Sequence, residues 1–293
     1  MNKKPPHLFC FGLGYSARTL AGILMDKGWT VTGTCRDKES VNKSAATGIK
    51  AFLFDGQRPF RHAATALKGV THLLTSVPPD AEGDPVLRHH QKDLSAVKGL
   101  AWIGYLSTTG VYGDTGGRMV DESAPLLPTS ERSRLRVEAE KQWRTATNIP
   151  AHIFRLSGIY GPANSVLDRV RDGTARRIDK PGHLFSRIHV DDIAGAAMAS
   201  MARPDPGAVY NLADDLPATA AEVTAFACEL LGVKPPPLIP FDEAAGKMSP
   251  MALSFWRDNR LVDNTRIKKE LAVRLIHPDY RSGLRAILAA ETR

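Results

Sequence analysis

Short apolar runs alternate with amphipathic stretches through the first two-thirds of the chain. The apolar runs are typical of buried β-strands, and they fall at residues 8–12, 30–35, 50–54, 71–76, 102–107 and 151–156. Helical periodicity lies between them, most clearly at 15–27, 84–98 and 130–146. Strands that alternate with helices in this way predict an α/β fold, a doubly wound parallel sheet with helices on both faces.

The order of elements changes after about residue 160. A stretch rich in Gly, Arg and Pro (172–187) precedes a helix of small residues, "DDIAGAAMASMA", and a strand, "AVYNLA". Thr219 and Glu222 then have the spacing of a helix capping box. We predict a main domain over residues 1–160 with returning segments at about 186–212. The remainder, 161–293, is predicted to form a smaller, partly interleaved C-terminal lobe that binds substrate.

Composition narrows the class of protein. The 293 residues are 43% apolar and 24% charged, which is ordinary for a globular protein. No apolar run approaches the roughly 18 residues of a membrane helix. Three cysteines, far apart and odd in number, argue against a disulfide framework and favour the cytoplasm. No Cys/His cluster has metal-ligand spacing, so we expect no metal site.

The net charge of +8 raises the possibility of nucleic-acid binding. However, the basic residues are spread along the chain and interleaved with acidic ones, without an aromatic-rich basic stripe. We therefore expect no nucleic-acid partner. A basic surface with a site for an anionic small molecule explains the charge better.

A glycine loop follows the first predicted strand. The stretch "FGLGYSA" has the pattern Gly12-x-Gly14-x-x-Ala17 at the head of a helix. Two glycines allow a tight turn and close approach to a pyrophosphate, and the helix N-terminus attracts the phosphates. We expect Gly12, Gly14 and Ala17 to bind a dinucleotide in a Rossmann-type domain, with Tyr15 and Ser16 between them.

Residues at the ends of the next strands bear on the choice of cofactor. Arg36 ends the second strand and suits a 2′-phosphate, whereas Asp37 suits a 2′-hydroxyl. We favour NADP and keep NAD as the alternative. Asp55 is a candidate for the adenine amino group or a turn residue, and Ser76 is a further cofactor candidate.

Several motifs, in order and spacing, resemble one family. They are "GLGYSA" (12–17), "STTGVYG" (107–113), "RLSGIYGP" (155–162), "SRIHVDDIAGA" (186–196), "VYNLADD" (209–215) and "DNTRIKKEL" (263–271). The chain is similar to the extended short-chain dehydrogenases/reductases, the NAD-dependent epimerase/dehydratase family. The resemblance implies an NAD(P)-binding Rossmann domain, a Ser/Thr–Tyr–Lys catalytic set, a homodimer and often a sugar-nucleotide substrate.

The resemblance also implies roles for individual residues. Thr108 lies at the Ser/Thr position, where its hydroxyl can hydrogen-bond a substrate oxygen. Tyr160 begins the segment that lies beside the nicotinamide in the family. His189, Asp191 and Asp192 match a stretch that is often structural, and an aspartate there can cap the following helix.

The family's tyrosine and lysine are missing. They should lie seven and three residues before an Ala-Glu pair, and counting back from Ala139-Glu140 gives Arg132 and Arg136. None of the six tyrosines has a lysine four residues later. Arg136 can still donate to ribose hydroxyls, but Arg132 cannot act as an acid because a guanidinium keeps its proton.

Two interpretations of "ERSRLR" (131–136) remain open. In one, Arg132 and Arg136 face the cofactor and an anionic substrate group. In the other, Arg134 with Glu138 and Arg136 with Glu140 form exposed i,i+4 ion pairs.

Two functions follow from this pattern. The first is an atypical NAD(P)-dependent oxidoreductase or epimerase-like enzyme acting on a small, anionic or sugar-nucleotide-like molecule. In it Thr108 orients the substrate, and water or another residue transfers the proton; Tyr112, Tyr160 and His189 are the candidate substitutes. The alternative is a non-catalytic sensor or scaffold that binds NADP(H).

Overall fold

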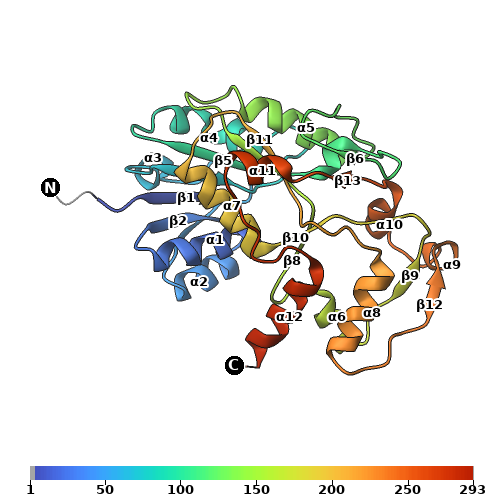
Figure 1. The fold of residues 1–293 in the computed structure, drawn as a ribbon. Coiled ribbons are helices and arrows are strands. Elements are labelled where there is room, and N and C mark those ends of the chain that lie inside the picture. Colours follow the sequence, from blue (N-terminus) through green and yellow to red (C-terminus); the bar gives the residue numbers. More distant parts are fainter. Residues whose placement is uncertain (1–3, 293) are drawn as a thin grey trace.

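The computed structural model describes residues 4–292, which form a parallel sheet with helices on both faces and a smaller lobe at one side (Figure 1). Over these residues the central sheet has seven strands in the order β11-β7-β5-β4-β1-β2-β3. Its strands are β1 (His7–Phe11), β2 (Thr30–Cys35), β3 (Lys50–Leu53), β4 (His72–Thr75), β5 (Trp102–Thr108), β7 (His152–Leu156) and β11 (Val209–Leu212). The order reverses between β1 and β4, which is where parallel sheets of this kind open a ligand crevice.

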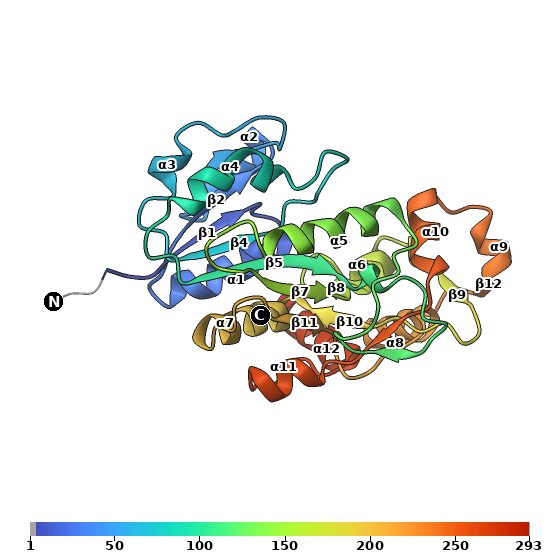
Figure 2. The ribbon, with the colours of Figure 1, turned by 90° about the horizontal axis from the view of Figure 1, so that it is seen from above.

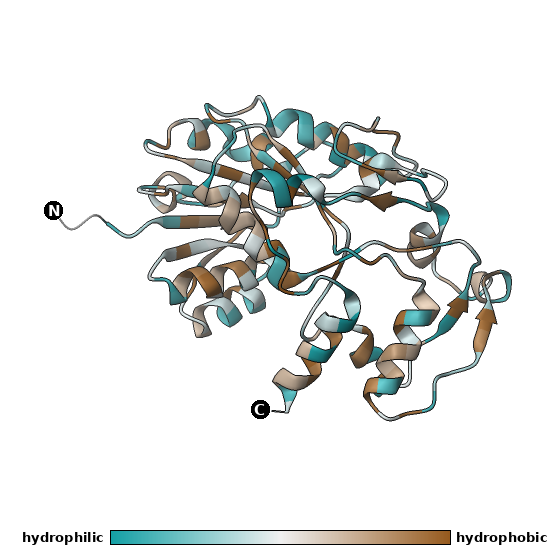
Figure 3. Ribbon diagram, in the orientation of Figure 1, coloured by the Kyte–Doolittle hydropathy of each residue, from teal (hydrophilic) through white to brown (hydrophobic). Residues whose placement is uncertain are grey.

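Helices cover the two faces of this sheet. They are α1 (Tyr15–Asp26), α2 (Lys38–Ala46), α3 (Ala63–Ala66), α4 (Pro85–Ser95), α5 (Glu131–Trp143), α7 (Val190–Ala202) and α11 (Thr265–Glu270). Because side chains alternate along a strand, Leu8 and Cys10 of β1 pack with α1 and α7, while Phe9 and Phe11 pack with α3, α4 and α5. In Figure 3 brown, apolar segments lie along the central strands and also on the helices that pack against them.

The smaller lobe contains short elements. They are α6 (Val166–Arg171), α8 (Ala220–Leu230), α9 (Phe241–Ala245), α10 (Pro250–Arg257), α12 (Tyr280–Glu291), β8 (Gly158–Tyr160), β9 (Arg177–Asp179), β10 (Arg187–His189) and β12 (Leu238–Pro240). Strand β10 pairs with β8, and β12 pairs with β9. Figures 1 and 2 show α8, α9 and α10 together on the side away from the N-terminus.

Segments from late in the chain return to the main sheet. Helix α7 packs on α1, and β11 pairs with β7 at one edge of the sheet. Strand β13 (Leu261–Val262) pairs with β6 (Met119–Val120), which lies in the loop after β5 and its short 3₁₀ helix η1 (Thr109–Tyr112). The interleaving follows from these pairings.

The predicted α/β sheet is confirmed, and most strand boundaries lie within one or two residues of the prediction. The capping box is also confirmed, because Thr219 Oγ1 accepts from Glu222 N at 3.1 Å and Glu222 Oε2 accepts from Thr219 N at 3.0 Å. Helix α2 lies between two predicted strands, where helical patterns were expected without bounds, and the short paired strands of the lobe were not predicted. Nowhere in residues 4–292 does a helix reach the length and apolarity needed to cross a bilayer.

Candidate active site

A cleft of about 830 Å³ runs from the glycine loop along the carboxyl edge of the sheet to the smaller lobe. Residues of β5, α5, α6, α8, α10 and α12 line it. The predicted cofactor residues that line it are Gly14, Tyr15, Ser16, Ala17, Ser76 and Tyr160, and the predicted catalytic residues are Thr108, Arg132 and Arg136. One cavity thus joins most of the residues that the sequence suggested separately.

The glycine loop has the geometry that a dinucleotide requires. Gly12 has φ +86°, and a Cβ there would lie 2.7 Å from Ser76 Oγ, so only glycine fits. Ser76 Oγ donates to Gly12 O at 2.7 Å and thereby fixes the turn. Gly14 is the N-cap of α1 and supplies no side-chain cap. The first N–H groups of α1 therefore remain available for phosphate oxygens.

Tyr15 closes the loop against the smaller lobe. Its hydroxyl donates to Pro162 O at 2.9 Å. Burial, and then the nearby carboxylates of Asp191 and Asp168, raise the pKa of Tyr15 to about 12. The phenol is therefore neutral at physiological pH and acts as a hydrogen-bond donor to the backbone.

The two candidate ribose contacts after β2, Arg36 and Asp37, have different surroundings. Asp37 is the N-cap of α2, and its carboxylate accepts from Ser40 N at 2.7 Å. Hydrogen bonds from Ser40 lower the pKa of Asp37. The Arg36 side chain is 89% exposed, and it approaches Asp37 only at 3.5 Å. Asp37 thus caps the helix through one oxygen and pairs with Arg36 Nε through the other, and the rest of the exposed Arg36 guanidinium remains accessible.

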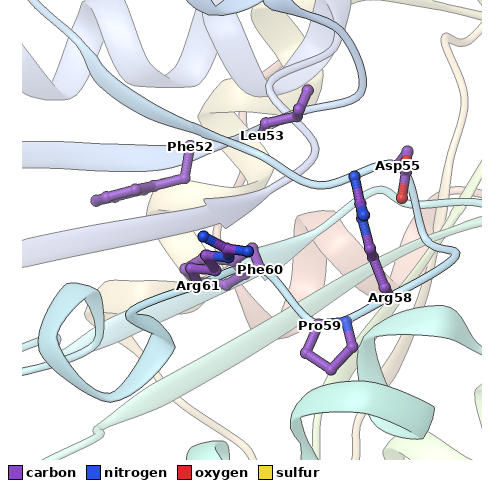
Figure 4. A pocket seen from close by; sticks show the side chains of 7 residues that line it. All are labelled: Phe52, Leu53, Asp55, Arg58, Pro59, Phe60 and Arg61. Atoms are coloured by element: carbon purple, nitrogen blue, oxygen red, sulfur yellow. The ribbon is translucent and has the colours of Figure 1, made fainter.

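Asp55 lies away from the cleft, in a second cavity of about 360 Å³. Figure 4 shows the side chains that line this cavity, from β3 and the loop that follows it. The Asp55 carboxylate accepts from Gln57 N at 3.0 Å, which is a turn-forming contact. Its predicted contact with adenine stays a prediction.

Thr108 stands at the carboxyl end of β5. Its Oγ1 accepts from Gly110 N at 3.0 Å as the N-cap of η1. The hydroxyl of the preceding Ser107 is not available to a ligand as a donor, because it donates to Glu140 Oε1 at 2.5 Å. Thr108 keeps its own proton for donation into the cleft, since no acceptor for it lies among the described residues.

The two arginines at the family's tyrosine and lysine positions both line the cleft. Arg136 Nη1 donates to Leu106 O at 2.8 Å and to the Tyr105 hydroxyl at 2.9 Å, which holds the guanidinium against β5. Arg132 is exposed and reaches the opposite wall, where its guanidinium lies 5.9 Å from the centre of the Phe255 ring. The α5 face thus presents two cations to the cleft.

The i,i+4 ion pairs considered for this helix do not form. Arg134 pairs with Glu131 at 3.1 Å, and Glu138 pairs with Lys141 at 2.8 Å. Glu140 is buried and pairs with Arg155 of β7 at 2.8 Å. The helical spacing rule failed because Glu140 has a partner from another element, and a buried charge requires one.

Three substitutes were considered for the missing acid. Tyr160 lines the cleft, but its hydroxyl donates to Asp279 O at 3.2 Å and burial raises its pKa. Tyr112 and His189 do not line the cleft. The Tyr112 hydroxyl donates to Asn211 Oδ1 at 2.7 Å, and burial lowers the pKa of His189 to about 4. None of the three is poised to deliver a proton.

His189, not an aspartate, caps α7, because its Nδ1 accepts from Asp191 N at 3.2 Å. Asp192 instead accepts from Ile276 N at 2.6 Å and His277 N at 3.1 Å, tying the segment before α12 to α7. His189, Asp191 and His277 bring ligand-capable atoms within 4.8 Å of one another. Sequence spacing missed this cluster because His277 comes from a distant segment.

The sequence analysis also missed three arginines that line the cleft from the lobe side: Arg169, Arg187 and Arg260. Arg260 pairs with Asp258 at 2.7 Å, and Asp258 also accepts from Thr129 Oγ1 at 2.8 Å. Asp258 is the acidic residue that lines the cleft. The arginine-rich motif 172–187 had signalled only an irregular stretch, and the return of β10 beside β8 brings Arg187 to the cleft.

No family model matches the chain. It is 26% identical to Protein YeeZ of Escherichia coli K12 over 92% of this chain and 95% of that protein. It is 27% identical to a 3-diazoavenalumate denitrifying reductase of a Streptomyces species, over 92% of this chain and 96% of that protein.

Solved structures give the fold. A conserved protein of unknown function from Silicibacter pomeroyi is 49% identical, with a TM-score of 0.90 over 97% of this chain and 99% of that chain. A putative NAD-dependent epimerase/dehydratase from Methylobacillus flagellatus is 24% identical, with a TM-score of 0.74 over 99% of this chain and 100% of that chain. A dTDP-glucose 4,6-dehydratase from Bacillus anthracis in complex with NAD is 16% identical, with a TM-score of 0.74 over 99% of this chain and 97% of that chain. The chain belongs to the family of the Silicibacter protein, and its fold is that of the extended short-chain dehydrogenases/reductases, the NAD-dependent epimerases/dehydratases.

Proposed function

We propose that the chain is an NADP(H)-dependent oxidoreductase that acts on a small molecule without a catalytic tyrosine. The observation that carries the proposal is the single cleft that joins the glycine loop, Thr108 and the α5 arginines to the smaller lobe. A relative of similar length is named a reductase, which agrees with this class of reaction.

The residues present fit a dinucleotide. Gly12 occupies a backbone conformation that a side chain would block, and α1 begins without a side-chain cap. These features would hold the pyrophosphate. Arg36 would hold the 2′-phosphate, because Asp37 is engaged in capping α2. This pattern supports NADP over NAD.

When bound, NADPH supplies a hydride to the substrate and NADP⁺ accepts one. Thr108 can donate its free proton in a hydrogen bond to a substrate oxygen near the carboxyl end of β5. Negative charge on that oxygen would be stabilised by the Arg136 guanidinium, which β5 holds in place. The proton that neutralises the product oxygen would come from water, since neither guanidinium releases one.

A second candidate is the non-catalytic NADP(H) sensor, and one observation favours it. Among the three tyrosines that line the cleft, Tyr15 and Tyr160 donate their hydroxyl protons to Pro162 O and Asp279 O, whereas the Tyr280 hydroxyl accepts from Arg281 Nε. A cleft in which two of the three phenols are held by backbone carbonyls suits binding without turnover. Steady NADPH oxidation coupled to a product would exclude the sensor.

The proposal is tested by calorimetric titration of the cofactor-stripped protein with NADPH, NADP⁺, NADH and NAD⁺. We expect micromolar binding, with the 2′-phosphorylated forms preferred by about tenfold. Gly12→Val should abolish binding of all four, because its side chain would meet Ser76. Gly195→Ala is the matched control, since an added Cβ there meets no atom within 4 Å. Absence of binding to the wild-type protein would refute the function.

A further inference from the structure

We propose that Arg169 and Arg187 form an anion subsite that binds the carboxylate of a small aromatic acid, the substrate of this cleft. The inference rests on the proposed function, because it names the substrate class of the same site. It comes from three features of the cleft: arginines without acidic partners, aromatic walls and limited volume.

Charge balance in the cleft is the first feature. Five arginines line it, whereas Asp258 is the acidic residue that does so. Asp258 is already paired with Arg260. Across residues 4–292, no carboxylate oxygen lies within 4.0 Å of the guanidinium nitrogens of the other four: Arg132, Arg136, Arg169 and Arg187. Cations gathered in a cleft without counter-ions favour an anionic ligand.

Arg187 has the most constrained environment of the four. Its Nη1 donates to Phe185 O and to Ala218 O, both at 2.9 Å, so the backbone fixes the guanidinium in one orientation. Burial lowers its pKa; the charges of Asp214, Tyr160 and Tyr280 act against this shift, and the charge of Arg169 adds to it. A partly buried cation beside a second cation is unfavourable. An oxyanion between them would remove that cost, and the planar fork of arginine matches a carboxylate.

Asp214 is the acidic group whose charge acts most on Arg187, but the two form no ion pair within 4.0 Å. Asp214 is buried, and burial raises its pKa to about 7, although the charge of Arg187 acts against this shift. Its Oδ2 has no hydrogen-bond partner within the described chain. Asp214 is therefore only partly ionised near pH 7, and no carboxylate oxygen lies within 4.0 Å of the Arg187 guanidinium in residues 4–292.

Aromatic side chains determine what the anion is attached to. Phe185 and Trp256 line the cleft with their ring centres 5.0 Å apart, at right angles. Phe255, Tyr160 and Tyr280 add further aromatic surface. Such walls favour a flat apolar body that stacks or meets ring edges. Among the charged side chains of the cleft all but Asp258 are arginines, which favours an anionic group on that body.

Volume limits the size of this body. Sites for one drug-sized ligand commonly occupy about 300–1,000 Å³. The cleft of about 830 Å³ includes the glycine loop, so it must accommodate part of the dinucleotide as well as the substrate. The space that remains suits a single-ring acid and not a complete sugar nucleotide.

The test is calorimetric titration of trans-cinnamate into the protein, both free and saturated with NADP⁺. Cinnamyl alcohol has the same ring without the carboxylate, and phenyl phosphate presents a different oxyanion. We expect cinnamate to bind at least about tenfold more tightly than the alcohol. Arg187→Gln should weaken cinnamate binding by about tenfold or more, and Arg169→Gln by about threefold, with NADPH affinity unchanged.

Arg144→Gln is the matched control, because Arg144 is exposed at the end of α5 and outside the cleft, and it should leave cinnamate binding unchanged. Equal affinity for acid and alcohol, or an unaltered Arg187→Gln, would overturn the subsite. Tighter binding of phenyl phosphate than of cinnamate would overturn the carboxylate assignment. No cinnamate binding at about 10 mM, with NADPH binding intact, would refute only the substrate class. Loss of NADPH binding in the wild type would instead refute the proposed function.

Discussion

Two arginines on neighbouring short segments of this protein have opposite surroundings. Arg155 is 4% exposed, and its guanidinium donates to both oxygens of Glu140 and to the Tyr112 hydroxyl. Burial acts to lower the pKa of Arg155, but the hydrogen bonds and charge of Glu140 outweigh it and raise the pKa. Arg187 donates to two backbone carbonyls, has no acidic partner within 4.0 Å in residues 4–292, and has a lowered pKa.

The contrast distinguishes a structural charge from a functional one. Arg155 and Glu140 satisfy each other, and Ser107, Tyr112 and Asn211 complete a network that joins β5, β7 and β11 beneath the cleft. Arg187 has no acidic partner in the protein, and it lines the cleft, where an anionic ligand can pair with it. A buried arginine with a carboxylate partner, such as Arg155, thus supports the fold, whereas an arginine without one, such as Arg187, is a candidate for binding a ligand.

The largest expected effect follows from breaking the satisfied pair. Arg155→Met should lower the free energy of unfolding by about 3–5 kcal/mol, because it leaves the Glu140 charge buried without a partner. Urea denaturation monitored by circular dichroism measures the change. The double variant Glu140→Met/Arg155→Met should recover most of the loss. If the double variant is as unstable as the single one, the pair is not the source of the effect.

The ionisation of Asp214 gives a pH-dependent test of the surroundings of Arg187. Its pKa of about 7 lies above the ordinary value of 3.8, so the fold favours the protonated form. The contribution of protonated Asp214 to the stability of the fold is fully present below about pH 4 and is lost as pH rises through 7. Asp214→Asn should therefore match the wild type near pH 4 and exceed it by on the order of 2–4 kcal/mol near pH 9. Denaturation curves at the two pH values measure the difference in free energy of unfolding between the variant and the wild type. If this difference is the same at both pH values, the raised pKa of Asp214 is contradicted.

A catalytic variant extends the comparison to the carboxyl end of β5. Thr108→Ala should reduce kcat/KM by about 10–100-fold once a substrate is identified, since the donated hydrogen bond to the substrate oxygen is lost. The same change removes the cap of η1 and costs about 1 kcal/mol of stability. Thr108→Ser keeps both contacts and is the control. Undiminished turnover in Thr108→Ala would exclude the proposed role.

The smallest expected effect concerns the 2′-phosphate of NADPH. Arg36→Gln should weaken NADPH binding by about tenfold, or 1.4 kcal/mol, and leave NADH binding unchanged. Lys38→Gln is a suitable control, because Lys38 is a nearby basic residue at the start of α2. Calorimetry on both variants measures the difference. Equal losses for NADPH and NADH would mean that Arg36 does not read the 2′-phosphate.

The main fold was predictable because its determinants are local in the sequence. Apolar runs such as those of β1 and β7 and the glycine turn at Gly12 each carry their own signal. The site was predictable only where a motif marks it, as at Thr108 and Arg136. Arg187 lies in the motif 186–196, but neither it nor Arg169 carries a local signal of a place in the cleft, because α6 and β10 meet there only through the folding of the lobe. Glu140 misled the helical spacing rule, since its partner Arg155 lies on another element.

The most direct test of the central claim is a crystal structure of the protein in complex with NADP⁺. The account predicts the pyrophosphate at the start of α1, the 2′-phosphate beside Arg36, and the nicotinamide in the cleft within reach of Thr108 and Arg136. Arg187 would then face the open space beside the nicotinamide. A dinucleotide bound elsewhere, such as the cavity at Asp55, or none at millimolar concentration, would contradict it.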